Sequence, residues 1–356
     1  MTLRPGRPVN VELEAPDLYA RLDPNNMQGR RIDDADRQQV FLNHFGTGLD
    51  ESLSNAGRLH GWRLQNLFEA MVVSLGRVKL IKTEDSGSYF FDDETGDVKL
   101  PDFRIVTHDN QSLLVEVKNI APGQKVRTQR LGREYLDAQL RYAEWTNSRL
   151  MWAHYWSALN LWSLVDAAKL GPTGNTVELT LETAMKMSEM RVLGDKLVAT
   201  TPPLVMSLVA DESKPRRTRE TDKDKRFAQF TVGKVEFRCG SQPINGGIEQ
   251  QIAFFLILYG RWQKEPMGTF DSEEKPERID WVCTPQEQVP GQEFQMVGYL
   301  CELYSMLYNV ATLGDEGSVQ TLWHEPDPGF LAKLIPPDYW DEQHDLPLWL
   351  FEMHPS

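Results

Sequence analysis

The sequence has few cysteines, no net positive charge and no long run of apolar residues. Its three cysteines, Cys239, Cys283 and Cys301, lie far apart and fit neither a zinc-binding spacing nor a disulfide framework, which favours a reducing cytoplasm. The longest apolar run, residues 252–259, is far too short to cross a bilayer. Residues 3–8 lack the apolar core of a signal peptide. We therefore expect a cytoplasmic protein that does not contact a membrane.

The formal net charge of −14 argues against one mode of nucleic-acid binding. A chain with 52 acidic and 38 basic residues does not coat DNA through bulk charge, so any contact with DNA must use local basic patches. An apolar content of 40% and ten tryptophans indicate a packed globular protein. Because 356 residues exceed a typical single domain, we expect two domains.

The most informative stretch begins with Pro101 and Asp102 and ends with Glu116 and Lys118. Its middle, residues 107–111, is rich in turn formers, which predicts two strands joined by a tight connection. Because side chains alternate faces along a strand, Glu116 and Lys118 share one face. If Asp102 lies on the neighbouring strand, two carboxylates and one lysine converge.

Such a group suits metal-assisted hydrolysis of a phosphodiester. Two nearby carboxylates repel each other, and a divalent cation removes that repulsion. Mg²⁺ prefers oxygen ligands and keeps several waters, so one or two carboxylates plus a substrate phosphate suit it. The metal activates a bound water, and the lysine can orient that water or stabilise the pentavalent phosphorus. The alternative is an exposed hairpin that carries an ordinary cross-strand Glu-Lys pair.

Pro101, Asp102, Glu116 and Lys118 resemble the motif of the PD-(D/E)xK nuclease superfamily, which includes many restriction endonucleases. The resemblance implies an α/β fold with a restriction-endonuclease-like core, in which helices flank a mixed sheet in the order helix, three strands, helix, strand. It also implies Mg²⁺ or Mn²⁺ as cofactor, bound by Asp102 and Glu116 and by the carbonyl of Val117. Lys118 would act on the water or the transition state.

A helix is predicted over residues 60–75, where apolar side chains follow the i, i+3, i+4 pattern between Gly57 and Gly76. Many members of the superfamily carry a glutamate on this first helix that reaches the metal. Glu69 stands at that place and is therefore a further candidate catalytic and metal-binding residue. The alternative is a solvated carboxylate on the helix surface.

The chain turns basic after Lys118, and a second helix is predicted over residues 128–146. Tyr142 lies in its apolar stripe and is expected to pack in the core. RecB-type members carry a glutamine and a tyrosine here, separated by three residues, whereas two residues separate Gln139 from Tyr142. The candidates for contact with DNA are Lys125, Arg127, Arg130, Arg133, Gln139 and Arg141.

Residues 150–156 and 159–165 predict a hairpin whose aromatic side chains are expected to be buried rather than stacked on bases. His154 is expected to be a structural histidine with satisfied ring nitrogens.

Four segments are expected along the chain. Residues 1–56 form an N-terminal extension, and residues 57–212 the nuclease-like domain. Residues 213–226 are charged and nearly free of apolar side chains, which predicts a linker or, alternatively, a loop that orders on DNA. Residues 227–356 are expected to form a mainly helical accessory domain that contacts a protein partner, DNA or a second copy.

The resemblance implies a metal-dependent DNA nuclease, and a large accessory domain on a small nuclease core suggests, by analogy with the superfamily, an endonuclease of a bacterial defence, restriction or mobile-element system. Two alternatives stay open. One is a nucleic-acid-binding subunit whose nuclease core is silent until a partner or effector binds. The other is a purely structural interaction protein in which the Asp-Glu-Lys group is an ion pair.

Overall fold

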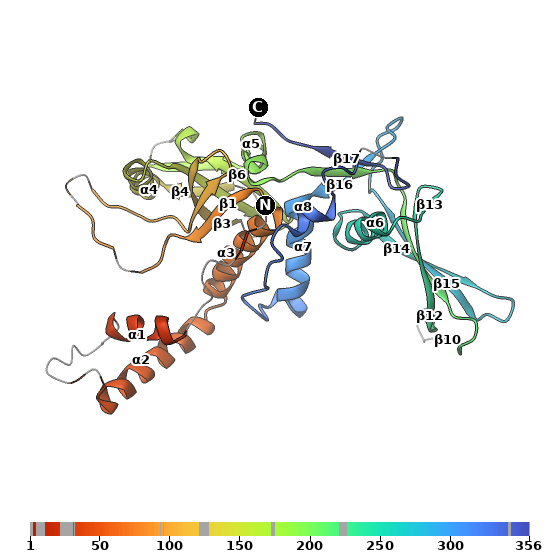
Figure 1. Ribbon diagram of the computed structural model, residues 1–356, viewed down its shortest axis with the longest axis horizontal. Coiled ribbons are helices and arrows are strands. Elements are labelled where there is room, and N and C mark those ends of the chain that lie inside the picture. Colours follow the sequence, from red (N-terminus) through yellow and green to blue (C-terminus); the bar gives the residue numbers. More distant parts are fainter. Residues whose placement is uncertain are drawn as a thin grey trace.

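The computed structural model has a mixed α/β fold. In Figure 1 a central body of sheet and helices carries two projecting helices at one end and a long antiparallel sheet at the other. The residues described are 3–4, 11–21, 31, 33–87, 89–92, 94, 96–120, 128–171, 175–220, 226–340 and 343–355.

The first sheet has five strands in the order β1-β2-β3-β5-β6. Strands β3 and β5 are parallel and all other neighbours are antiparallel. Both hairpins expected from the sequence are present, one formed by β2 and β3 and one by β5 and β6. The strands are β1 (Val78–Thr83), β2 (Phe103–Thr107), β3 (Ser112–Ile120), β5 (Arg149–Trp156) and β6 (Leu161–Asp166).

A helix covers each face of this sheet. Helix α3 (Ala56–Leu75) lies on the face where Leu113, Val115 and Val117 enter a large buried cluster. Helix α4 (Arg133–Trp145) lies on the other face, where Leu114 joins a second cluster. The alternation expected along β3 therefore holds, because successive side chains enter different clusters.

The predicted helix over residues 60–75 is confirmed, and it begins earlier, where the Asn55 side chain accepts a hydrogen bond from the Arg58 amide. The helix predicted over residues 128–146 is shorter than expected. Residues Thr128–Gly132 form strand β4, which pairs antiparallel with β7 (Thr176–Thr180). Because β7 satisfies the backbone of these residues, α4 starts only after Gly132.

The expectation that residues 227–356 are mainly helical is wrong. A second five-stranded sheet has the order β13-β12-β9-β15-β14, and a three-stranded sheet has the order β16-β8-β17. The helices are α6 (Gly247–Tyr259), α7 (Leu300–Thr312) and the short α8 (Phe330–Leu334). The strands are β8 (Leu197–Thr200), β9 (Leu204–Ala210), β12 (Val232–Cys239), β13 (Gln242–Ile244), β14 (Gln263–Phe270), β15 (Pro276–Thr284), β16 (Gln295–Tyr299) and β17 (Leu348–Phe351).

Strand β14 is an example of a strand in residues 227–356 that the sequence pattern does not predict. It contains Pro266 and Gly268, both unfavourable in strands, and most of its side chains are exposed. It pairs with β15 at the sheet edge, where a proline is tolerated because one side of the strand needs no donor. Likewise, helix α7 starts only at Leu300, because the mainly apolar residues 295–299 before it pair with β8.

Strands from the two halves of the chain share sheets. Strand β9 pairs with β12 and β15, and β8 pairs with β16 and β17. The charged segment 213–226 carries β10 (Arg217–Glu220), which pairs antiparallel with β11 (Arg226–Gln229). The large buried cluster includes side chains of α3, which precedes this charged segment in the sequence, and of α6 and α7, which follow it. Residues from both sides of the segment therefore pack in one core.

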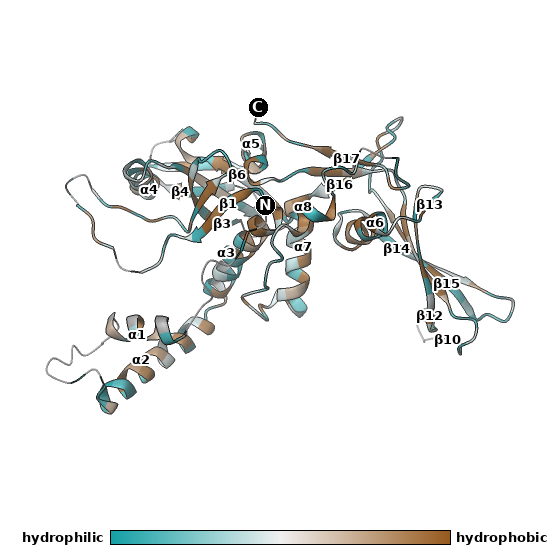
Figure 2. Cartoon of the chain, in the orientation of Figure 1, coloured by the Kyte–Doolittle hydropathy of each residue, from teal (hydrophilic) through white to brown (hydrophobic). Residues whose placement is uncertain are grey.

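Helices α1 (Val11–Arg21) and α2 (Ala35–Leu53) project from the body (Figure 1). Helix α2 has no buried residue, and Asp34 caps its N-terminus. Figure 2 shows hydrophilic residues at the start of α2 and largely apolar strands around β3. No helix within the described part of the chain is long and apolar enough to cross a membrane.

Candidate active site

Asp102 and Glu116 approach each other from neighbouring strands. Asp102 directly precedes β2, and Phe103 pairs with Val115, so Asp102 lies beside the strand segment that carries Glu116. The Val117 amide donates a hydrogen bond of 2.6 Å to Oδ2 of Asp102. Both carboxylates are buried, with exposed fractions of 7% and 4%. The start of β2 thus holds the Asp102 carboxylate against the backbone of β3.

Lys118 forms an ion pair with the second carboxylate. Its Nζ donates to Oε1 of Glu116 and lies 5.0 Å from the ring centroid of Tyr135. The Tyr135 hydroxyl, from α4, donates to the same Glu116 oxygen at 2.6 Å. Burial and the negative charge of Glu116 raise the pKa of Tyr135, so its hydroxyl stays protonated and remains a donor.

Gln139 holds the other oxygen of Glu116. Its Nε2 donates to Oε2 of Glu116 at 2.7 Å, and its Oε1 accepts a hydrogen bond of 3.0 Å from the Trp152 indole. The side chain is fully buried, so the expected contact between Gln139 and DNA is wrong. The reason is that α4 turns this residue toward the sheet rather than toward solvent.

Helix α3 supplies Gln65 to the first carboxylate. Gln65 Nε2 donates to Oδ1 of Asp102 at 2.5 Å. Glu69 lies one turn further along the same helix, and its side chain makes no hydrogen bond or ion pair with the described residues. Burial raises the pKa of Glu69. A role for Glu69 at the metal stays a prediction.

The negative charge of Glu116 affects the protonation of Asp102. Burial and the negative charge of Glu116 raise the pKa of Asp102 to about 7, despite the opposing effects of the Val117 amide, Lys118 and Gln65. A divalent cation bound here would favour the ionised form of Asp102, with release of its proton to solvent, because the positive charge would offset both the burial and the repulsion.

The donor set fits a hard divalent cation. Asp102 and Glu116 offer carboxylate oxygens, which Mg²⁺ and Mn²⁺ prefer. Among the described residues there is no group of three or more His, Cys, Asp or Glu side chains that could enclose a metal. Two carboxylates suit Mg²⁺, which usually keeps waters and takes further oxygen atoms from a phosphate. Participation of the Val117 carbonyl stays a prediction.

The sequence pattern does not single out Tyr135 or Gln65 as site residues. Tyr135 lies within the helix predicted over residues 128–146, and Gln65 lies within the helix predicted over residues 60–75, where the apolar pattern is the main signal. A spacing of four residues was the available clue, since Tyr135 and Gln139 share one helix face, as do Gln65 and Glu69.

Three of the arginines predicted to contact DNA, Arg130, Arg133 and Arg141, are exposed or partly exposed on or next to α4. Arg130 pairs with Glu178 at 2.7 Å, and Arg133 pairs with Asp137 at 3.4 Å. Arg141 Nε donates to the Asp97 carbonyl at 2.8 Å. Lys125 and Arg127 lie outside the described residues. Contact between these basic residues and DNA stays a prediction.

A buried ion pair anchors the strand that leads from Asp102. The Glu84 amide donates to the Asp102 carbonyl at 2.8 Å. The Glu84 carboxylate accepts hydrogen bonds of 2.6 Å from both Arg104 Nη2 and the Tyr142 hydroxyl. Tyr142 also packs against the apolar cluster under α4, as expected.

This ion pair predicts a loss of stability in acid. Burial alone would raise the pKa of Glu84, but hydrogen bonds from Arg104 and Tyr142 outweigh it and lower the pKa to about 2. A depressed pKa in the folded state contributes stability above the unfolded-state pKa of 4.5, and this contribution is lost as the pH falls from 4.5 towards 2. We expect the gap in unfolding free energy between wild type and Glu84→Gln, measured by urea denaturation, to shrink over that range. A gap that does not change with pH would contradict this role.

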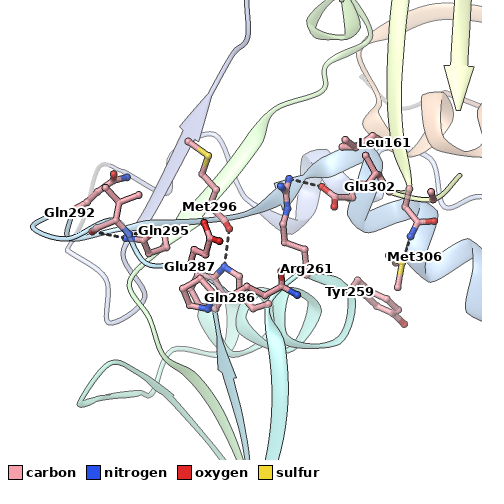
Figure 3. A pocket seen from close by; sticks show the side chains of 17 residues that line it. Leu161, Tyr259, Arg261, Gln286, Glu287, Gln292, Gln295, Met296, Glu302 and Met306 are labelled. Atoms are coloured by element: carbon pink, nitrogen blue, oxygen red, sulfur yellow. Dashed lines mark hydrogen bonds and ion pairs between the residues drawn. The ribbon is translucent and has the colours of Figure 1, made fainter. Parts of the chain in front are cut away.

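A separate cavity of about 800 Å³ lies away from the carboxylates (Figure 3). The turn after β5, the end of α6, the loop around Gln286 and helix α7 line it. Arg261 and Glu302 form an ion pair of 2.8 Å in its wall. None of the candidate catalytic residues lines it.

No protein-family model matches this chain, and no curated protein matches it either. Among solved structures, the chain is similar to Hjc, a Holliday junction resolvase from the archaeal hyperthermophile Archaeoglobus fulgidus. The identity is 14%, the match covers 39% of this chain and 95% of that chain, and the TM-score is 0.27.

Proposed function

We propose that this chain is a metal-dependent nuclease of the PD-(D/E)xK type that hydrolyses phosphodiester bonds in DNA. The observation that carries the proposal is the pairing of two buried carboxylates, Asp102 and Glu116, with Lys118 ion-paired to one of them. Buried carboxylates close together are unfavourable without a cation, so their presence points to a site for one.

Each side chain has a distinct role in this proposal. Asp102 and Glu116 would hold Mg²⁺ or Mn²⁺, and the cation would activate water and neutralise charge on the phosphate. Lys118 would orient the attacking water or stabilise the negative charge that develops on the phosphoryl oxygens. Gln65 and Gln139 hold the carboxylates in place through hydrogen bonds, and thereby set their orientation before a substrate binds.

DNA is the proposed substrate because basic side chains border α4, the helix that covers the site. Arg130 and Arg133 are largely exposed there, even though each has an acidic neighbour. Phosphate contacts of this kind fix the position of a duplex without reading its sequence. We propose further that the protein is an endonuclease that acts in a defence, restriction or mobile-element system.

The test is cleavage of supercoiled plasmid by the purified protein in Mg²⁺, Mn²⁺ or EDTA. We expect nicked and linear products with either metal and none with EDTA, since the carboxylates alone cannot activate water. Asp102→Asn serves as the matched variant, because it keeps the shape of the side chain and removes its charge. Cleavage that persists in EDTA or in this variant would reject the proposal.

A silent nuclease is the second candidate, and one observation favours it. All four oxygens of Asp102 and Glu116 accept hydrogen bonds in this structure, from Gln65, the Val117 amide, Lys118 and Gln139. A cation must displace or share some of these donors. Calorimetric binding of Mn²⁺ without plasmid cleavage would favour this second candidate, in which a partner or effector completes the site.

A further inference from the structure

His154 is a fully buried histidine without a hydrogen-bond partner. It lies on β5, with an exposed fraction of 0%, and neither ring nitrogen makes a hydrogen bond with the described residues. The sequence-based expectation of a satisfied structural histidine is therefore wrong. Buried polar atoms are nearly always paired, and leaving one unpaired destabilises the fold. An unpaired histidine beside a candidate active site therefore needs a reason.

The side chains next to His154 do not form hydrogen bonds with its ring nitrogens. The rings of Trp152 and Trp156 lie on either side of it, with centroids at 6.2 and 6.0 Å. Both tryptophans use their indole N–H elsewhere, on Gln139 and on Ser163. The Trp152 carbonyl slightly favours a proton on the imidazole, but it makes no hydrogen bond of ordinary geometry. An imidazole proton held on that side leaves the other nitrogen with a free lone pair.

The strand register places His154 directly beside Lys118. In the parallel pair of β3 and β5, Lys118 is the partner of His154, and Glu116 is the partner of Trp152. Directly opposite residues point to the same face of a sheet, and their Cβ atoms lie about 5 Å apart. Burial and the positive charge of Lys118 lower the pKa of His154 to about 3, so the imidazole is neutral and can accept a hydrogen bond.

The present anchor of Lys118 is an oxygen that a metal would also use. Lys118 Nζ donates to Oε1 of Glu116, with the Tyr135 hydroxyl at 3.4 Å. A cation on Glu116 would compete for that oxygen and would repel the ammonium group. Lys118 would then need another acceptor to keep a single orientation. The unpaired nitrogen of His154 is the buried acceptor on the adjacent strand.

We propose that His154 is a positioning residue for Lys118, and that its free ring nitrogen accepts a hydrogen bond from Nζ when Glu116 holds a cation. This inference rests on the proposed nuclease function. The interaction is a hydrogen bond only: no covalent bond forms or breaks, and no proton is transferred. The imidazole would hold the ammonium group on the face of the sheet that carries Glu116.

The experiment compares four variants with wild type in plasmid cleavage and thermal unfolding. His154→Phe keeps a ring of similar size and removes both nitrogens, and His154→Gln restores an acceptor. Ser163→Ala is the matched control, because Ser163 is the register partner of His154 on β6 and accepts the Trp156 N–H. Lys118→Ala gives the activity without the ammonium group.

We expect His154→Phe to lower kcat by about 10²-fold through misplacement of Lys118, with the KM for DNA and the Mg²⁺ requirement unchanged. Its Tm is expected to stay the same or rise by about 2 °C, because two unpaired nitrogens are removed. His154→Gln is expected to recover part of kcat. Ser163→Ala is expected to lower Tm and leave kcat unchanged.

Two outcomes overturn the inference alone. One is an active wild type, an inactive Lys118→Ala variant and a fully active His154→Phe variant. The other is a fall in kcat that Ser163→Ala shares and that follows the loss of Tm, which means that His154 acts only through packing. A wild-type protein that neither cleaves DNA nor binds metal removes the proposed function, and the inference falls with it.

Discussion

Replacing Lys118 by alanine is expected to lower the rate of DNA cleavage at saturating Mg²⁺ by about 10²–10³-fold, the usual effect of removing one group that stabilises the transition-state charge. Lys118 is only partly exposed and is held between Glu116 and Tyr135, so its ammonium group is oriented before a substrate arrives. The measurement is kcat on a labelled DNA duplex, together with Mn²⁺ binding by calorimetry. Metal binding should persist, because both carboxylates remain.

The matched control is Lys79→Ala. Lys79 also lies on a strand of the first sheet, and its Nζ donates to Asn110 at 2.6 Å, away from the carboxylates. This variant should cleave DNA at the wild-type rate. Equal rates for wild type and Lys118→Ala would show that Lys118 has no part in the chemistry, and the ion pair with Glu116 would then be structural.

Replacing Arg104 by methionine is expected to destabilise the fold by about 2–3 kcal/mol, the usual cost of removing a strong hydrogen-bond partner from a largely buried charge. The Glu84 side chain is 6% exposed, and Arg104 donates to it at 2.6 Å. Methionine keeps most of the volume of arginine but offers no donor. Lys82, at 3.3 Å, and the Tyr142 hydroxyl would remain as partners of Glu84. The measurement is the unfolding free energy from urea denaturation at pH 7.

Arg130→Met is the matched control for this loss of stability. Arg130 and Glu178 form an ion pair of 2.7 Å, but their side chains are 72% and 45% exposed. Solvent screens such a pair, so its loss should cost at most about 1 kcal/mol. Equal losses in the two variants would mean that the burial of Glu84 does not control its contribution to stability.

The Arg104 variant is also expected to impair the site indirectly. Glu84 bonds the backbone of Asp102, and Arg104 lies on β2, two residues after Asp102. A change in this ion pair therefore alters the segment that positions the first carboxylate. Activity and stability should fall together here, unlike in Lys118→Ala, where activity is lost and the fold is kept.

Local patterns in the sequence were sufficient for the core elements of the site. The alternation of side chains along residues 113–118 placed Glu116 and Lys118 on one face, and the turn-rich residues 107–111 joined two adjacent strands. The apolar stripe of α3 was equally clear, because one face of that helix is buried along most of its length. These features depend only on the backbone period of a strand or a helix, which a short stretch of sequence contains.

Strand pairing in the second half of the chain could not be predicted from such patterns. Strand β14 has an exposed and irregular sequence, and its partner β15 determines that it is extended. Residues 295–299 continue the apolar character of α7, yet they pair with β8 from a distant part of the chain. Long-range pairing overrides local propensity, because each strand hydrogen bond requires a partner that the local sequence does not specify.

The two carboxylates, the lysine and the strands that carry them can be predicted from local sequence patterns. The helix residues that meet them, namely Gln65, Tyr135 and Gln139, cannot be predicted in this way, and neither can the unpaired imidazole of His154 beside Lys118. Helical periodicity defines a face, but it does not define the rotation and height at which that face docks on a sheet. Those depend on packing between α3, α4 and the two apolar clusters, which form only when distant segments meet.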